Sequence, residues 1–219
     1  MKSAILAAAV LLAGGMAATA GPLITTTFSL NTSGIEGMGT FYLAFQLADG
    51  SGTGDANNTV TLYDFNFGTG SAAGSPMLYG GASGDIASVL SLTDSDPFFN
   101  AAVEGFTPGA LLTFNATFTD NPDVGSPVQD QFFMSVLDGG GNGIPTTDAV
   151  NDSFITVTLD GTVDNANGVP TPPRQTFAAD LTQTSYNLPA PEAVPEPGSY
   201  FMLALGAGLL GLKGRLYRF

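Results

Sequence analysis

Cysteine, histidine and tryptophan are all missing from this chain of 219 residues. Without cysteine and histidine, the chain forms no disulfide bond and no zinc, haem or iron–sulfur centre ligated by those residues. The same absence excludes Ser-His-Asp and Cys-His catalysis. Basic residues are scarce too, because five Lys and Arg stand against 19 Asp and Glu, for a formal net charge of −14. A chain this acidic repels nucleic acid and anionic membrane surfaces, so we expect no nucleic-acid partner.

The first twenty residues have the three parts of an export signal. Lys2 supplies a positive start, residues 4–13 are apolar, and the small residues Ala18 and Ala20 precede Gly21. Small side chains at these two positions fit the pocket of signal peptidase. We therefore predict that residues 1–20 are a signal peptide and that the mature chain begins at Gly21.

The other end of the chain combines a proline-rich stretch with an apolar run. Residues 189–199 contain four prolines, which bar a helix and predict an extended polyproline II linker. Residues 200–212 carry no charge and predict a hydrophobic helix, and residues 213–219 add three basic side chains. The positive-inside rule places this basic tail in the cytoplasm. Thirteen helical residues reach only about 20 Å, short of the roughly 30 Å of a bilayer core, so the span is marginal.

A short motif precedes that apolar run. The segment reads Val194, Pro195, Glu196, Pro197, Gly198 and Ser199. Together with the apolar run and the basic end, it resembles the PEP-CTERM sorting signal of exported bacterial proteins. The resemblance implies transient anchoring in the inner membrane of a Gram-negative-type bacterium and cleavage by exosortase near Pro195. It also implies secretion or cell-surface display in an extracellular polysaccharide or biofilm matrix. A chance proline linker before a C-terminal helix is the alternative interpretation.

Strand patterns fill the middle of the chain. Apolar and polar residues alternate over 41–48, 112–119 and 154–159, and residues 24–30 and 132–137 behave similarly. Between Val60 and Phe67 the apolar phase slips by one residue, which predicts a β-bulge or a bend. Turn clusters rich in Gly, Asn and Asp separate these runs. We therefore predict an all-β antiparallel β-sandwich over residues 21–188, of jelly-roll or immunoglobulin-like kind.

One loop has the oxygen spacing of a calcium site. Asp49, Ser51, Thr53 and Asp55 alternate along it, and Gly54 stands where a sharp turn is needed. The bidentate Glu that an EF-hand places at position twelve is replaced by Val60. These four residues are a candidate calcium site, and calcium is the one candidate cofactor. Aspartate is also a common turn residue, and a plain turn is the alternative.

Enzymatic activity is not expected. Export and sorting would remove both lysines, leaving no Ser–Lys pair, and would leave Arg174 as the single base against every acidic residue but Glu196. Glu is scarce for a glycosidase, and carboxylate-only hydrolysis is therefore the weakest hypothesis. Our leading hypothesis is a non-enzymatic interaction or structural module, associated with exopolysaccharide. The alternative is a carbohydrate- or calcium-binding module with a defined ligand.

Overall fold

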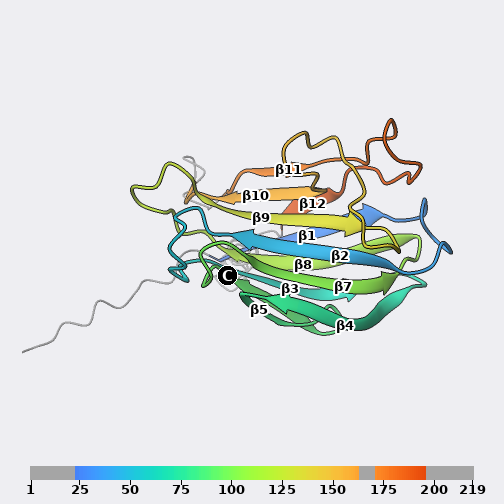
Figure 1. Cartoon of the computed structure of the whole chain (residues 1–219), viewed down its shortest axis with the longest axis horizontal. Coiled ribbons are helices and arrows are strands. Elements are labelled where there is room, and N and C mark those ends of the chain that lie inside the picture. Colours follow the sequence, from blue (N-terminus) through green and yellow to red (C-terminus); the bar gives the residue numbers. More distant parts are fainter. Residues whose placement is uncertain (1–22, 163–170, 196–219) are drawn as a thin grey trace, which may run out of the picture.

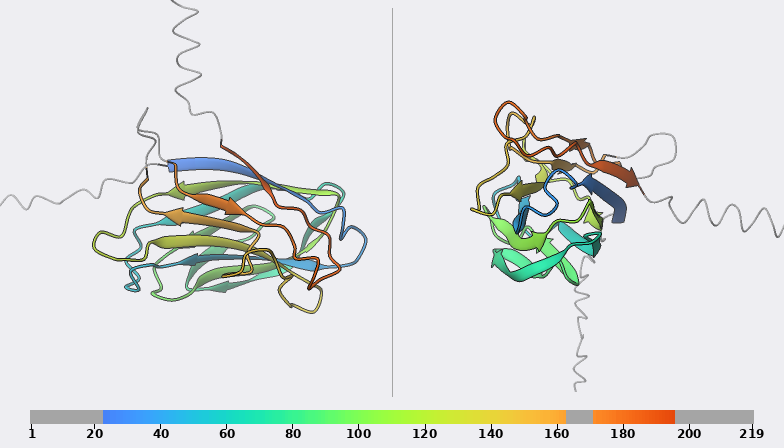
Figure 2. Two further views of the ribbon diagram at one scale, coloured as in Figure 1. Left: turned by 90° about the horizontal axis from the view of Figure 1, so that it is seen from above. Right: turned by 90° about the vertical axis from the view of Figure 1, so that its right-hand side faces the viewer.

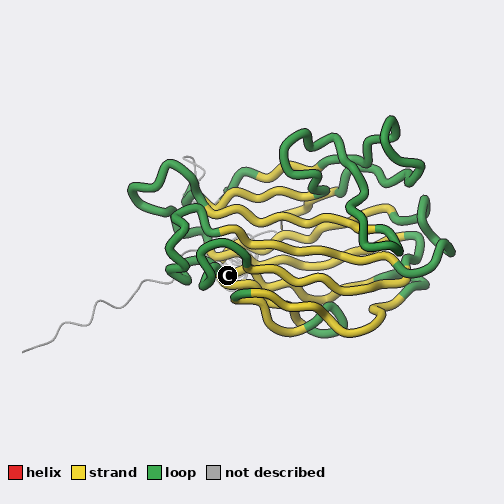
Figure 3. The backbone as a smooth tube through the Cα atoms, viewed as in Figure 1, coloured by secondary structure: helices red, strands yellow, loops and turns green. Residues whose placement is uncertain are grey.

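The structure is a computed structural model, and it describes residues 23–162 and 171–195. These residues form twelve β-strands joined by loops and turns, and they include no helix (Figures 1 and 3). The strands are β1 (Leu23–Asn31), β2 (Phe41–Ala48), β3 (Thr59–Asn66), β4 (Ser71–Tyr79), β5 (Gly81–Gly84), β6 (Val89–Thr93), β7 (Asn100–Thr107), β8 (Leu111–Thr119), β9 (Asp130–Leu137), β10 (Ile155–Leu159), β11 (Arg174–Thr176) and β12 (Glu192–Pro195).

The strands form two antiparallel sheets. Sheet A has the order β12-β1-β8-β3-β6-β5, and sheet B has the order β11-β10-β9-β2-β7-β4. The right-hand view in Figure 2 looks at the two sheets from one end. The predicted antiparallel β-sandwich is thus confirmed.

The pairing pattern distinguishes between the two topologies that the sequence left open. β1 pairs with β8, β2 with β7 and β3 with β6, while β4 and β5 follow each other directly through Gly80. A long hairpin wound over two sheets produces such nested pairs, which is the jelly-roll arrangement. Strands β9 to β11 then extend sheet B beyond β2, and β12 extends sheet A beyond β1.

The core lies between the sheets and is dominated by phenylalanine. On β8, Phe114 stacks on Phe28 of β1 at a ring-centroid distance of 5.4 Å and on Phe65 of β3 at 5.1 Å. It also meets the edge of Phe45, from β2 in the opposite sheet, at 5.8 Å. These side chains occupy the inward positions of the alternating runs, which explains why residues of period two form strands here.

The slip between Val60 and Phe67 is a bulge in β3. The register against β8 shifts between Tyr63 and Asn66, and Asp64 has a positive φ of 55°. The extra residue lets Val60 and Leu62, before the bulge, and Phe67, after it, all reach the core. The predicted bulge is confirmed.

The chain after residue 188 differs from the predicted linker. Glu192–Pro195 form β12, paired with Thr26–Ser29 of β1, and Ala193 packs against the core. Proline is tolerated on β12 because it is an edge strand. The sandwich therefore continues into the proline-rich segment.

Candidate functional site: an aspartate cluster and a sorting segment

Four aspartates lie where strands of both sheets end on one side of the sandwich. Asp49 directly follows β2, and Asp130 is the first residue of the neighbouring β9. Asp94 directly follows β6 of sheet A, and Asp123 belongs to the connection between β8 and β9. The antiparallel pairing of β2 with β9 brings the first two side by side, because the end of one strand faces the start of the other.

Three of these carboxylates converge on one point. One oxygen each from Asp49, Asp123 and Asp130 lies within 4.8 Å of the other two. Asp130 is fully buried and Asp123 is only 5% exposed. Asp130 accepts hydrogen bonds from the Gly50 N–H and from Asn58 Nδ2, both at 2.7 Å. Backbone and amide donors thus fix the orientation of the central carboxylate.

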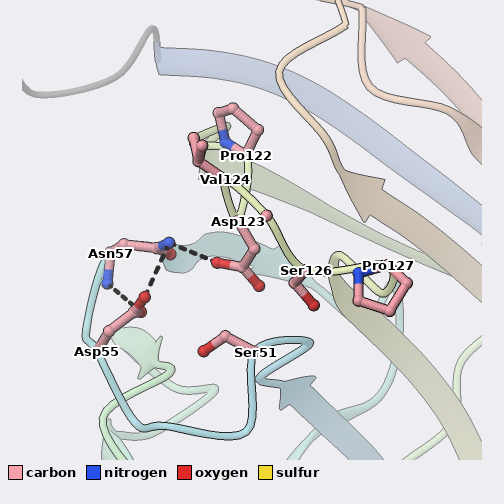
Figure 4. Close-up of a pocket in the computed structure, with 9 residues that line it drawn as sticks. Ser51, Asp55, Asn57, Pro122, Asp123, Val124, Ser126 and Pro127 are labelled. Atoms are coloured by element: carbon pink, nitrogen blue, oxygen red, sulfur yellow. Dashed lines mark hydrogen bonds between the residues drawn. The ribbon is translucent and has the colours of Figure 1, made fainter.

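The partners of Asp123 are incomplete. Its Oδ1 accepts a hydrogen bond from Asn57 Nδ2 at 2.7 Å (Figure 4). Its Oδ2 is shielded from solvent and has no hydrogen-bond partner, and the same holds for Asn57 Oδ1. Buried polar atoms normally have a partner, so two bare oxygens at one place require an explanation.

Electrostatics at the cluster disfavour full ionisation. Burial raises the pKa of Asp94, and the adjacent Asp130 raises it further. Burial also raises the pKa of Asp123, where Asp130 again adds to the effect and the hydrogen bond from Asn57 opposes it. The sequence has no Lys or Arg between Lys2 and Arg174 that could neutralise these charges. Among the described residues, hydrogen bonds offset part of this negative charge, and the raised pKa values favour the protonated carboxyl groups.

The structure places the four loop residues predicted to bind calcium in different surroundings. Asp49 Oδ1 accepts hydrogen bonds from Ser51 Oγ at 2.7 Å and from the Gly52 N–H at 2.8 Å, and Ser51 Oγ also bonds Thr53 Oγ1. Asp55 is exposed and accepts hydrogen bonds from Asn57. Asp49 joins Asp123 and Asp130, whereas the two hydroxyls and Asp55 are engaged within the loop. Calcium binding by the four loop residues together stays a prediction.

Gly54 has the conformation that the sequence predicted for a sharp turn. Its φ is +67°, and a Cβ there would lie 2.7 Å from the Ser95 carbonyl oxygen. Its N–H donates to Asp49 Oδ2, which turns the loop back toward the cluster. Next to this loop lies an open pocket of about 550 Å³, lined by Ser51, Asp55, Asn57 and Asp123 among others (Figure 4). Solvent therefore comes close to the cluster from one side.

A second feature is a shallow recess on the outer face of sheet B. Its volume is about 220 Å³, and aromatic rings of Phe99 and Phe133 line it together with the polar side chains of Gln46, Ser135 and Asn151. Phe99 is 48% exposed and packs edge-on against Tyr79 at a centroid distance of 5.6 Å. An exposed ring beside amide groups can stack on a ligand ring and hydrogen-bond its substituents.

A third feature is the start of the proline motif. Val194 and Pro195 belong to β12, and Val194 is 58% exposed. Glu196, Pro197, Gly198 and Ser199 lie outside the described residues, as do Ala18, Ala20 and Gly21 of the predicted cleavage site and the apolar run 200–212. Among the residues that the structure describes, no helix is long and apolar enough to cross a membrane.

Fold and motif together define a β-sandwich module with a C-terminal processing segment. Comparison with protein-family models matches residues 193–218 to the PEP-CTERM protein-sorting motif. This motif is consistent with a PEP-CTERM domain-containing protein and supports an exosortase-targeted, exported protein. No curated protein and no solved structure matches the chain.

Sequence reasoning did not select Asp123 and Asp130 as partners of Asp49. One signal was available, because Asp49 directly follows the alternating run 41–48 and Asp130 lies just before the run 132–137. Neighbouring antiparallel strands would bring these two positions together. Which strands are neighbours was the missing information, and the sequence pattern alone does not contain it.

Proposed function

We propose that this protein is a non-enzymatic interaction module that acts at the cell surface or in the extracellular polysaccharide layer after exosortase processing. The observation that carries the proposal is the sorting motif at residues 193–218. Exosortase would act near Pro195, the last residue of the edge strand β12. The folded sandwich would then be the released or displayed part.

The recess on sheet B supports association with polysaccharide. Stacking of a sugar ring on Phe99 would bury apolar CH groups, and Gln46, Ser135 and Asn151 would offer donors and acceptors to its hydroxyls. The chain has no tryptophan, so Phe and Tyr are its only rings for such contacts. A chain with a net charge of −14 would favour neutral glycans over acidic ones.

Cosedimentation with exopolysaccharide from the producing bacterium tests this proposal. Phe99→Ala should weaken the apparent affinity, taken from the bound fraction over a range of polysaccharide concentrations, by about fivefold, the loss expected for a stacking contact of about 1 kcal/mol. Phe98→Ala is the matched control, since Phe98 is 79% exposed, adjacent in sequence and not part of the recess.

Three results would contradict the proposal or modify it. Equal binding of the two variants and the unaltered chain would mean that the recess does not bind the polysaccharide. Release of soluble sugar by the purified protein would contradict a non-enzymatic role. Saturable binding to a single glycan in a screen would favour the alternative, a carbohydrate-binding module with a defined ligand.

A further inference from the structure

We propose that Asp49, Asp123 and Asp130 bind one calcium ion at the end of the sandwich where β2 ends and β9 begins. The site shares Asp49 with the loop indicated by the sequence and takes its other carboxylates from the β8–β9 connection and from β9. It does not depend on the proposed polysaccharide contact, because the recess lies on the outer face of sheet B.

The geometry fits an ion of this size. Calcium binds oxygen ligands at roughly 2.3–2.6 Å, so two ligands on opposite sides of it lie about 4.6–5.2 Å apart. The three carboxylate oxygens all lie within 4.8 Å of one another. Magnesium holds its ligands at about 2.0–2.1 Å, demands a near-ideal octahedron and gives up its water reluctantly. Calcium accepts irregular sets of oxygen ligands, and water from the adjacent pocket would complete its coordination.

The bare oxygen of Asp123 points independently to a ligand. Asp123 is 95% buried, and its Oδ2 has no hydrogen-bond partner although its Oδ1 is held by Asn57. A buried carboxylate oxygen without a partner is unfavourable, because it has lost water and gained nothing in return. A cation next to Oδ2 would give this oxygen the attractive partner that it lacks. Asn57, whose Nδ2 donates to Asp123 Oδ1, also has a buried Oδ1 without a hydrogen-bond partner.

The charge balance leads to the same conclusion. Three carboxylates meet at the proposed position and Asp94 adjoins Asp130, in a part of the sequence without any Lys or Arg. Ionised carboxylates this close together repel one another. A divalent ion would replace this repulsion by attraction and would tie the β2–β3 loop to the start of β9.

Isothermal titration calorimetry on the full chain, stripped with EDTA and kept in mild detergent, tests the proposal directly. We expect about one calcium ion per chain. Calcium at about 100 times Kd should raise Tm by roughly 5 to 10 °C, because binding to the folded state alone stabilises it. Magnesium at the same concentration should raise Tm much less.

Two variants separate a site from general screening. Asp123→Asn keeps the size of the side chain and an acceptor for Asn57, and should weaken calcium binding on the order of tenfold or more. Asp138→Asn removes the same charge from an exposed turn, where Asp138 accepts hydrogen bonds from Gly140 and Asn142, and should leave calcium binding unchanged.

The proposal is overturned if the unaltered chain binds no calcium. It is overturned equally if calcium and magnesium shift Tm alike and Asp123→Asn responds as Asp138→Asn does. If Asp123→Asn does not fold, titration of the unaltered chain still decides, because binding with a stoichiometry of about one supports the site and no binding refutes it.

Discussion

Replacing Phe114 by alanine would remove the central ring of the core. Phe114 is 1% exposed and packs against Phe28 and Phe65 of its own sheet and against Phe45 of the other. Large-to-small changes of a buried Phe cost about 3–5 kcal/mol, through lost burial and the cavity left behind. Three aromatic contacts at about 0.5–1.5 kcal/mol each favour the upper half of that range.

Urea unfolding followed by tyrosine fluorescence or far-UV circular dichroism measures this loss. The free energy of unfolding should fall by about 4 kcal/mol with an unchanged denaturant slope, and Tm should fall by roughly 8 to 16 °C. Phe99→Ala is the control, because its ring is half exposed on the outer face and its loss should cost about 1 kcal/mol or less. A loss below about 1 kcal/mol for Phe114→Ala, or equal losses for the two variants, would refute a core centred on Phe114.

Two further predictions concern a buried acid and the last strand. Burial raises the pKa of Glu104 above 4.5, the hydrogen bond from the Ile86 N–H opposes this, and the charge of Asp85 adds to it. The folded chain therefore holds this proton more tightly than the unfolded chain, and the contribution of Glu104 to stability is fully present below pH 4.5 and is lost as pH rises through the folded pKa. Urea unfolding between about pH 4 and 8 should show a weaker fall in stability for Glu104→Gln than for the unaltered chain, and identical pH profiles would contradict this account. On β12, Ala193→Asp should cost about 1–3 kcal/mol because it brings a carboxylate against the core, whereas Val194→Asp on the exposed side should cost little; equal losses in thermal unfolding would mean that β12 does not pack as described.

The alternation of apolar and polar residues predicts a strand best where one face of the sheet is buried and the other is exposed to solvent. The runs at 41–48 and 112–119 correspond to β2 and β8, because each inward residue is apolar and each outward residue is small or polar. β4 and β5 escaped prediction, since Gly74 and Pro76 interrupt the first and the second consists only of Gly, Ala and Ser. Their pairing with β7 and β6 forms these strands, and local sequence does not encode that pairing.

The candidate site was predictable only in part for the same reason. Asp49 stood out because its loop has the spacing of a calcium ligand set. Asp123 and Asp130 are more than seventy residues away in sequence and reach Asp49 only through the β2–β9 pairing. For β12, the prolines predicted an extended backbone correctly, but the free edge of β1 that converts this segment into a strand is a tertiary feature.

The intact mass of the protein recovered outside the cell tests the central claim, export followed by exosortase processing, most directly. We expect a chain that begins at Gly21 and ends close to Pro195. Replacing Pro195, Glu196 and Pro197 with alanine should instead trap a form that keeps its apolar tail in the membrane fraction. A released protein that still carries residues 200–219 would contradict processing at the PEP-CTERM motif.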